Sequence, residues 1–223
     1  AQGRAFTDAE IRARLDAADI SPLTPHTAAR ATARGSGGSS VAVLPLTGLI
    51  APRSSMVNGE SMPSGTSCEA FAAAFDASVA DESVSAIVID IDSPGGSVDR
   101  VPELAQRVFA ARGKKPITAV ANSLAASAAY WIGTAADELV ITPSGEVGSI
   151  GVFCIHEDAS GFYSGRGIKH TIIKAGEFKA EGNPYEPLSE DAVAAIQSDI
   201  DEIYGWFVNA IAKHRGVGVA TVQ

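Results

Sequence analysis

Ser127, which is flanked by alanines, is the first residue to consider as a nucleophile. It lies in residues 121–131 (ANSLAASAAYW), after an apolar, β-prone run at 116–120 and before small residues that continue as a helix through Ala136. At such a strand-to-helix junction the first helical N–H groups have no partners, and the helix dipole favours the negative charge that develops on an attacked carbonyl. Alanine and serine also fill tightly packed helices, so simple packing is the alternative interpretation.

Residues 92–96 (DSPGG) are a second candidate, because they close a predicted buried strand and open a helix. A glycine pair lets backbone N–H groups approach a ligand with no Cβ in the way. We expect the N–H of Gly96 or Gly95 to supply one arm of an oxyanion hole, and the N–H of Ala128 to supply the other. An ordinary strand-to-helix turn is the alternative.

A nucleophilic serine needs a base, and the four histidines do not provide an evident one. No histidine has an evident acidic residue placed in the sequence to act as its partner in a triad, so a Ser-His-Asp triad is unsupported. The histidines are His26, His156, His170 and His214. A lysine can serve instead when its ammonium is desolvated enough to lose its proton near neutral pH. Lys179, in a loop that follows a predicted strand, is the candidate, and a solvated surface lysine is the alternative.

Strands and helices that alternate along the chain must position these residues. Apolar runs predict strands at 41–46, 84–91, 116–120, 138–141 and 168–174. Helical periodicity predicts helices at 68–80, 98–111 and 127–136, a short one within 158–165, and a long one from Ser189 to Arg215. This alternation predicts an α/β fold with a parallel sheet and flanking helices.

The composition excludes several classes of protein. With 46% hydrophobic and 19% charged residues, the chain has enough apolar material for a real core. Its formal net charge of −9 argues against nucleic acid or anionic membrane as the main partner. It has no apolar run long enough to span a membrane. The two cysteines, Cys68 and Cys154, form no CxxC pair, so we expect reduced thiols in a cytoplasmic setting and no zinc site.

The first 40 residues differ in character from the rest. A capping-box pattern predicts a helix over 8–18, and residues 35–40 (GSGGSS) have the composition of a flexible linker. We therefore assign 1–40 to an N-terminal extension and linker, and 41–223 to the folded domain. Residues 51–66, rich in Ser, Pro, Gly and Met, are expected to form a mobile loop.

Four motifs in this order resemble the signal peptide peptidase A family, whose members are serine peptidases with the ClpP/crotonase fold. The motifs are residues 92–96 (DSPGG), 125–130 (AASAAY), 148–152 (GSIGV) and 176–179 (GEFK). Each motif alone is weakly specific, but the ordered set is strong. Residues 179–185 (KAEGNPY) look more like the lambda-type head-maturation (prohead) proteases of tailed phages. The resemblance covers residues 41–223.

Carried over by position, the resemblance implies Ser127 as the nucleophile and Lys179 as the general base. Ser149 would orient the lysine amine, and the N–H groups of Gly95 or Gly96 and of Ala128 would receive the oxyanion. It also implies a homo-oligomer, with no metal or cofactor. Two departures stand out. Relatives commonly have glycines where this chain has alanines at 128 and 129, and they usually continue past the last helix, so we expect the domain to lack its C-terminal end.

The resemblance implies an endopeptidase that processes scaffold or capsid proteins during phage head maturation, in the host cytoplasm or prohead. Three alternatives stay open. The chain could degrade cleaved signal peptides in bacteria, or it could be a non-catalytic assembly scaffold on the same fold. Acyl-CoA chemistry on the related crotonase fold ranks last, because it gives no reason for the set of Ser127, Ser149 and Lys179.

Overall fold

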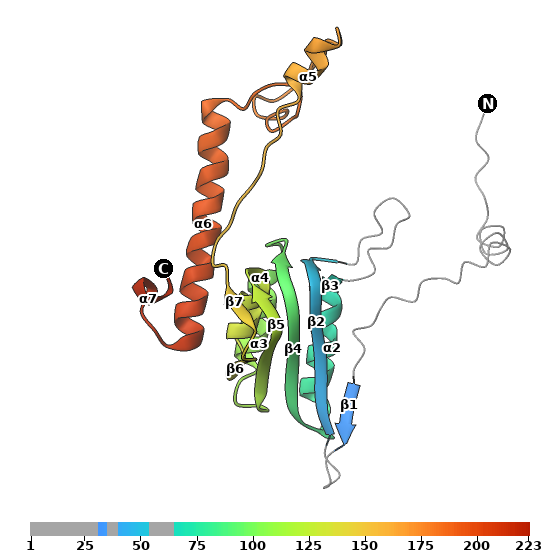
Figure 1. Cartoon of the computed structure of the whole chain (residues 1–223), viewed down its shortest axis with the longest axis vertical. Helices are drawn as coiled ribbons and strands as arrows, with labels where there is room; N and C mark the ends of the chain where they lie inside the picture. The colour runs from blue at the N-terminus through green and yellow to red at the C-terminus, as the bar shows by residue number, and fades with distance from the viewer. Residues whose placement is uncertain (1–30, 35–39, 54–64) are drawn as a thin grey trace, which may run out of the picture.

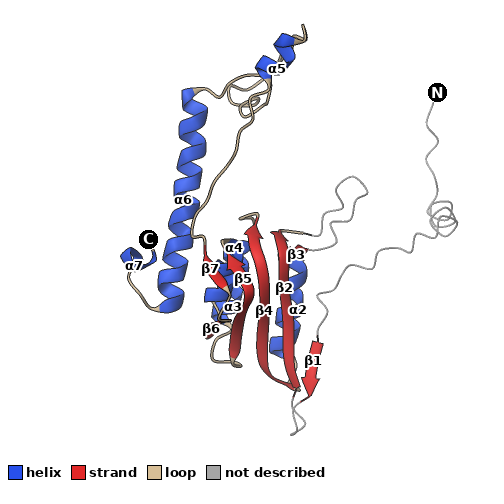
Figure 2. Ribbon diagram, viewed as in Figure 1, coloured by secondary structure: helices blue, strands red, loops and turns tan. Residues whose placement is uncertain are grey.

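A mostly parallel β-sheet forms the base of the computed structural model, which describes residues 31–34, 40–53 and 65–223. The main strand order is β1-β2-β4-β5-β6, with β3 beside β2 and β7 beside β5 (Figure 2). Within the described residues, only β1 pairs antiparallel. The strands are β1 (Ala31–Arg34), β2 (Ser40–Ala51), β3 (Gly65–Ser67), β4 (Val84–Gly96), β5 (Ile117–Ala126), β6 (Glu138–Ile141) and β7 (Glu146–Gly148).

The described residues form six helices, of which the first three connect the parallel strands and pack on one face of the sheet (Figure 1). They are α2 (Cys68–Ala80), α3 (Val101–Ala110), α4 (Ala128–Thr134), α5 (Ser160–Gly165), α6 (Glu190–Arg215) and α7 (Val219–Val222). Because α2, α3 and α4 each follow one parallel strand and precede the next, the chain has the alternating order of an α/β protein. The predicted α/β fold, with a parallel sheet and flanking helices, is confirmed.

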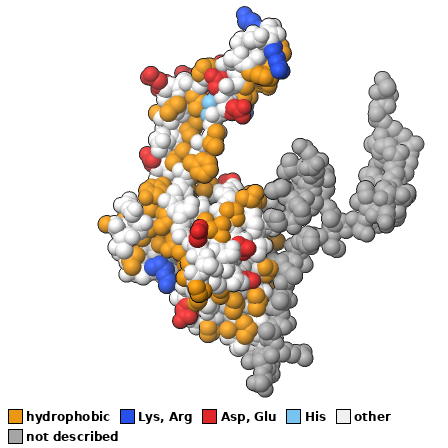
Figure 3. Space-filling model, viewed as in Figure 1, with side chains coloured by type: hydrophobic (Ala, Val, Ile, Leu, Met, Phe, Trp, Pro, Cys, Tyr) orange, Lys and Arg blue, Asp and Glu red, His pale blue; other side chains and the backbone are white. Residues whose placement is uncertain are grey.

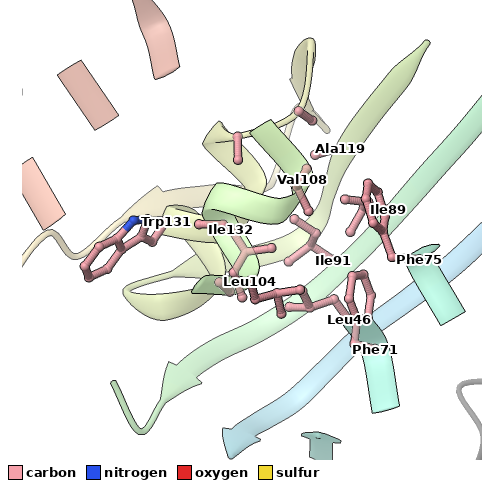
Figure 4. Close-up of a cluster of buried hydrophobic side chains, with 14 of the residues drawn as sticks. Leu46, Phe71, Phe75, Ile89, Ile91, Leu104, Val108, Ala119, Trp131 and Ile132 are labelled. Atoms are coloured by element: carbon pink, nitrogen blue, oxygen red, sulfur yellow. The ribbon is translucent and has the colours of Figure 1, made fainter. Parts of the chain in front are cut away.

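The core lies between the sheet and these helices. Alternate residues of the central strands point into it, as in Leu44 and Leu46 of β2, and Ile89 and Ile91 of β4, all fully buried. Figure 4 shows the cluster, which includes Leu46, Phe71, Phe75, Ile89, Ile91, Leu104, Val108, Ala119, Trp131 and Ile132. Burial of this apolar surface is the main source of stability for the sheet and its helices.

Serine side chains cap the N-terminal ends of two helices. Ser67 caps the start of α2, and its hydroxyl accepts a hydrogen bond from the Ala70 N–H at 3.2 Å. Ser189 caps the start of α6 in the same way, and its hydroxyl accepts from the Ala192 N–H at 3.0 Å. Gly216, with a φ of 65°, ends α6 in the left-handed conformation. The predicted bounds of both helices are confirmed.

An arm, which we define as residues 149–203, projects from the sheet (Figure 1). It leaves the end of β7 as an extended segment, carries α5, and returns along the first half of α6. The second half of α6 packs on the core, where Phe207 stacks on Trp131 of α4 with ring centroids 4.5 Å apart. The part of α6 that follows the arm therefore contacts the helix after Ser127.

The arm exposes large apolar side chains, some of which are visible in Figure 3. The most exposed are Phe153 (81%), Ile155 (79%), Ile173 (95%) and Phe178 (64%). Apolar surface gathered on a projecting segment is typical of a region that contacts another molecule.

Some segments differ from the sequence-based predictions. Residues 168–174, predicted as a strand, form no strand, because no neighbouring strand runs beside them on the arm. Strand β4 continues past Ile91 to Gly96, so the DSPGG motif belongs to the strand itself. Strand β6 has the predicted bounds, Glu138–Ile141.

The structure describes only part of the N-terminal region for which predictions were made. The helix predicted over 8–18 lies outside the described residues, as do the linker residues 35–39 and most of the predicted loop at 51–66. Residues 31–34, which fall within the predicted extension, form β1 and pair with β2. The division of the chain at residue 40 stays a prediction.

Candidate active site

Ser127 occupies the junction between β5 and α4 in a strained backbone conformation. Its φ is 51° and its ψ is −122°, a region that L-residues rarely adopt. Two hydrogen bonds hold it there: its N–H donates to the Gly148 carbonyl at 2.8 Å, and its carbonyl accepts from the Trp131 N–H at 3.0 Å. Its side chain is half-buried, and no hydrogen bond of its hydroxyl is found among the described residues. Strain held in this way is typical of functional positions.

The glycine turn at the end of β4 lies directly against Ser127. Because β4 and β5 are parallel neighbours, their carboxyl ends meet at one edge of the sheet. A Cβ on Gly95, whose φ is 98°, would lie 2.8 Å from Ser127 Cβ and 3.0 Å from the Ala128 nitrogen. A Cβ on Gly96 would lie 2.0 Å from the Ile50 carbonyl oxygen. Both positions therefore require glycine, one for its contact with Ser127 and one for its contact with β2.

The three predicted oxyanion donors differ in whether their N–H groups already have a hydrogen-bond partner. Ala128 is the first residue of α4, so its N–H has no partner within the helix. The Gly95 N–H donates to the Ser93 hydroxyl at 3.1 Å and is already engaged. Of the two glycines, Gly96 is therefore the better candidate to pair with Ala128. The oxyanion role of all three residues stays a prediction.

A pocket of about 610 Å³ opens beside Ser127. Its walls come from the ends of β2 and β4 and from the first residues of the arm. It is lined by Leu49, Pro94, Gly95, Gly96, Ser127, Ser149, Ile150, Gly151, Val152 and Phe153. The side chains are mostly apolar, which suits an apolar side chain of a bound peptide.

Ser149 lies in the same pocket as Ser127. It follows Gly148, whose carbonyl accepts the Ser127 N–H, and the pairing of β7 with β5 holds the two segments together. Ser149 also has a positive φ, of 56°, and its side chain is exposed. The structure thus brings together Ser127, Ser149, Ala128 and the glycine turn.

Lys179 does not line this pocket. It is exposed in a turn of the arm between α5 and α6, and its N–H donates to the Gly176 carbonyl at 3.4 Å. Figure 1 places this part of the chain at the end of the arm away from the sheet. A single chain in this conformation therefore does not bring Lys179 to Ser127.

The two acidic neighbours of Lys179, Glu177 and Glu181, are exposed like the lysine itself. The backbone carbonyl of Glu177 accepts from Lys174 Nζ at 2.7 Å, and the Glu181 carboxylate accepts from the Ser189 hydroxyl at 3.4 Å. Gly176 and Gly182 both have positive φ angles, of 94° and 75°. The backbone around Lys179 is therefore irregular.

None of the described histidines lines the pocket beside Ser127. His214 is buried under α4, where its Nδ1 lies 3.1 Å from the Thr134 hydroxyl. Burial, reinforced by the positive charge of Arg112, lowers the pKa of His214 from its usual 6.5 to about 4. His170 stacks on Tyr185 in the arm. Both histidines therefore make packing or hydrogen-bond contacts away from the pocket beside Ser127.

The described residues also show how possible metal ligands, apolar helices and cysteines are distributed. There, no group of three or more His, Cys, Asp or Glu side chains is placed to hold a metal ion. Across the same residues, no helix has the length and apolar character that crossing a bilayer requires. Cys68 is buried and Cys154 exposed, and both are free.

Sequence reasoning missed two features of the site. Ser93 was treated only as part of a turn, although its buried hydroxyl bonds to both Gly48 and Gly95. The pocket walls at Leu49 and Phe153 were also missed, because they come from segments far apart in the chain. A polar residue at an inward position of β4 was the available signal for Ser93.

Comparisons with known proteins place this geometry in context. The model of peptidase family S49 matches residues 110–223. The head-tail preconnector protein GP5 of Enterobacteria phage P21 is 32% identical, over 82% of this chain and 36% of that protein. The capsid assembly protease C of Escherichia phage lambda is 30% identical, over 82% of this chain and 41% of that protein. A ClpP1 mutant from Listeria monocytogenes superimposes with a TM-score of 0.45 at 14% identity, covering 81% of this chain and 75% of that one.

The chain therefore spans less than half the length of these two phage relatives. The putative signal peptide peptidase SppA of Enterococcus faecium is 30% identical, over 64% of this chain and 42% of that protein. The family model matches more than half of the chain, and the matched range, residues 110–223, includes Ser127, Ser149 and Lys179. The resemblance drawn from the four motifs is confirmed, and the chain belongs to peptidase family S49.

Proposed function

We propose that this chain is a serine endopeptidase that uses Ser127 as nucleophile and Lys179 as general base. The observation that carries the proposal is the strained Ser127 at the start of α4, in contact with the Gly95 turn and open to an apolar pocket. A nucleophile on a sharp strand-to-helix turn presents its hydroxyl to a substrate while neighbouring N–H groups face the developing charge.

The reaction would proceed in two stages. The neutral Lys179 amine takes the proton of the Ser127 hydroxyl as Oγ attacks the peptide carbonyl carbon. The N–H groups of Ala128 and Gly96 would stabilise the oxyanion, and the lysine ammonium would protonate the departing amine. Water, activated by the same amine, then releases the acyl group and restores the Ser127 hydroxyl. Ser149, beside Ser127 in the pocket, would orient the amine.

The position of Lys179 implies that the dyad forms between two copies of the chain. Lys179 is exposed at the far end of the arm, and apolar side chains such as Ile173 and Phe178 are exposed near it. Packing the arm against a second copy would bury these side chains and carry Lys179 toward that copy's Ser127. Desolvation at such a contact favours the neutral form of an amine, which a general base requires.

We propose phage scaffold or capsid proteins as substrates, cleaved during head maturation in the host cytoplasm or the prohead. The proposal is supported by the capsid assembly protease of phage lambda, which aligns with 82% of this chain. Degradation of cleaved signal peptides is a second candidate, because the pocket beside Ser127 is largely apolar and a putative signal peptide peptidase is among the relatives.

A pair of serine variants tests the activity. Ser127→Ala removes the proposed nucleophile, whereas Ser123→Ala removes an exposed hydroxyl four positions earlier, which donates only to Asp92. We expect a fluorophosphonate probe to label the wild type and the Ser123 variant but not the Ser127 variant. Mass spectrometry of co-expressed head proteins should show cleavage in the same two cases. An unlabelled wild type would instead favour a non-catalytic scaffold.

A further inference from the structure

Ser93 is a fully buried polar residue near the end of β4. Its hydroxyl donates to the Gly48 carbonyl at 2.6 Å and accepts from the Gly95 N–H at 3.1 Å. One hydroxyl has a single donor hydrogen and can accept through its lone pairs, so these two bonds satisfy it. Ser93 therefore joins the last part of β2 to the glycine turn.

The two segments that Ser93 joins both depart from regular strand geometry. The pairing of β2 with β4 shifts register between Thr47 and Leu49, and the pairing of β4 with β5 shifts between Ile91 and Ser93. Gly48 has a φ of 65° and Gly95 a φ of 98°. Because ladder pairing is interrupted there, a side-chain hydroxyl supplies hydrogen bonds that a regular sheet would take from its backbone.

Both hydrogen-bond partners of Ser93 lie next to residues of the candidate site. Gly95 contacts Ser127, since a Cβ at Gly95 would lie 2.8 Å from Ser127 Cβ. Gly48 precedes Leu49, which lines the pocket beside Ser127. The Ser93 hydroxyl thus holds the turn that presents the Gly96 N–H and, on its other side, one wall of the pocket.

We propose that Ser93 is a positioning residue, which orients the Gly95–Gly96 peptide so that the Gly96 N–H faces the oxyanion. It acts through the turn and does not contact the reacting atoms. The inference rests on the proposed peptidase activity and adds to it the residue that aligns the oxyanion-binding amide. By engaging the Gly95 N–H, Ser93 also determines which of the two glycines is free to donate.

A buried hydroxyl with only a structural role would behave differently. Ser78 provides the matched control, because it is also fully buried and its hydroxyl donates to the Ala74 carbonyl within α2, on a side of the molecule that does not line the pocket. Loss of the Ser78 hydroxyl leaves the Ala74 carbonyl with its helical N–H partner, whereas loss of the Ser93 hydroxyl removes the partner of the Gly95 N–H. Only loss of the Ser93 hydroxyl should change how a transition state is bound relative to a substrate.

The experiment compares Ser93→Ala with Ser78→Ala in the full chain. It measures kcat and KM on a peptide substrate, and the inhibition constant of a peptide aldehyde, whose hemiacetal oxygen occupies the oxyanion site. For Ser93→Ala we expect kcat to fall by roughly 10- to 100-fold and the aldehyde to bind more weakly by a similar factor, with KM changed by less than about threefold. Amide exchange at Gly95 should also accelerate. Ser78→Ala should leave all of these values near those of the wild type.

If Ser93→Ala does not fold, Ser93→Cys keeps the side-chain size but bonds more weakly, and it should show the same pattern at smaller amplitude. A folded Ser93 variant with wild-type kcat and aldehyde affinity would overturn the inference while leaving the peptidase proposal intact. A parallel rise in KM and fall in kcat, matched by Ser78→Ala, would overturn it too. A wild type that reacts with neither aldehyde nor fluorophosphonate would refute the proposed function, and this inference with it.

Discussion

At the scale of single residues, the candidate site depends on contacts so close that one added carbon atom would disturb them. Gly95 and Gly113 make this point together, because both have positive φ angles, of 98° and 80°. A Cβ at Gly113 would meet nothing within 4 Å, whereas one at Gly95 would press on Ser127 and the Ala128 nitrogen. The two positions share a backbone cost and differ only in their neighbours.

Gly95→Ala should therefore abolish peptidase activity, and Gly113→Ala should leave it unchanged. Both variants carry a backbone penalty of about 1 kcal/mol for a left-handed alanine, and Gly95→Ala adds steric strain of about 1–3 kcal/mol. Urea unfolding and peptide hydrolysis measure the two effects. Activity in a folded Gly95→Ala variant would show that the glycine turn does not shape the Ser127 site.

His214 couples the stability of the fold to pH. Its pKa is about 4 in the fold and near 6.5 in an unfolded chain, so between these values the unfolded state binds more protons. The free energy of unfolding should therefore lose nothing to His214 protonation above pH 6.5. As the pH drops toward 4, protonation of this residue should lower the free energy of unfolding by on the order of 2–3 kcal/mol. In His214→Gln, the slope of unfolding free energy against pH over this range should be shallower. An unchanged slope would mean that His214 titrates normally.

At the scale of elements, Arg112 secures the end of α4 opposite Ser127. Its guanidinium donates to the carbonyls of Thr134, Ala135 and Ala136, and to that of His214 in α6. These bonds satisfy carbonyls that the end of a short helix leaves without partners. The same side chain thus links the helix that follows Ser127 to the second half of α6.

Arg112→Met should destabilise the fold by about 2–4 kcal/mol, because several buried carbonyls lose charged donors. Arg107→Met is the matched control, since Arg107 makes an exposed ion pair with Asp76, and its loss should cost less than about 1 kcal/mol. Chemical denaturation of both variants measures the difference. Equal effects would show that the Arg112 bonds contribute little.

Elements with local signals were predicted well from the sequence. Helix α6 begins at its Ser189 cap and ends at Gly216, and β6 has the predicted bounds, because capping residues and apolar runs act within a few positions. The strand predicted at 168–174 was wrong because alternation alone does not supply a neighbouring strand to pair with. Ser127 and the glycine turn were predicted from their place at strand-to-helix junctions, and Ser149 only from the family resemblance. The contacts of Ser93 could not be predicted, because its partner Gly48 lies far away in the sequence.

At the scale of the whole molecule, the arm is the feature that a single chain does not explain. It holds exposed apolar residues such as Phe153 and Ile173, and it carries Lys179 away from the pocket. Burial of large side chains of this kind contributes about 1.5–3 kcal/mol each, so leaving them in water forgoes a substantial stabilisation. Assembly through the arm would recover that stabilisation and complete the dyad together.

Ile173→Glu should therefore weaken both assembly and hydrolysis, because it places a charge on an apolar contact surface. Lys174→Glu, at an exposed neighbouring position whose Nζ donates to Glu177, is the control for added negative charge. Light scattering gives the oligomeric mass of each variant. A monomeric wild type that hydrolyses peptides would contradict the role assigned to the arm.

The central claim, that Ser127 of one copy works with Lys179 of another, is tested most directly by mixing two inactive variants. Ser127→Ala and Lys179→Ala should each be inactive alone. After the two are co-expressed or unfolded and refolded together, some sites combine an intact Ser127 with an intact Lys179, and peptide hydrolysis should return. No activity in a mixture shown by mass spectrometry to contain hetero-oligomers would contradict a dyad shared between copies.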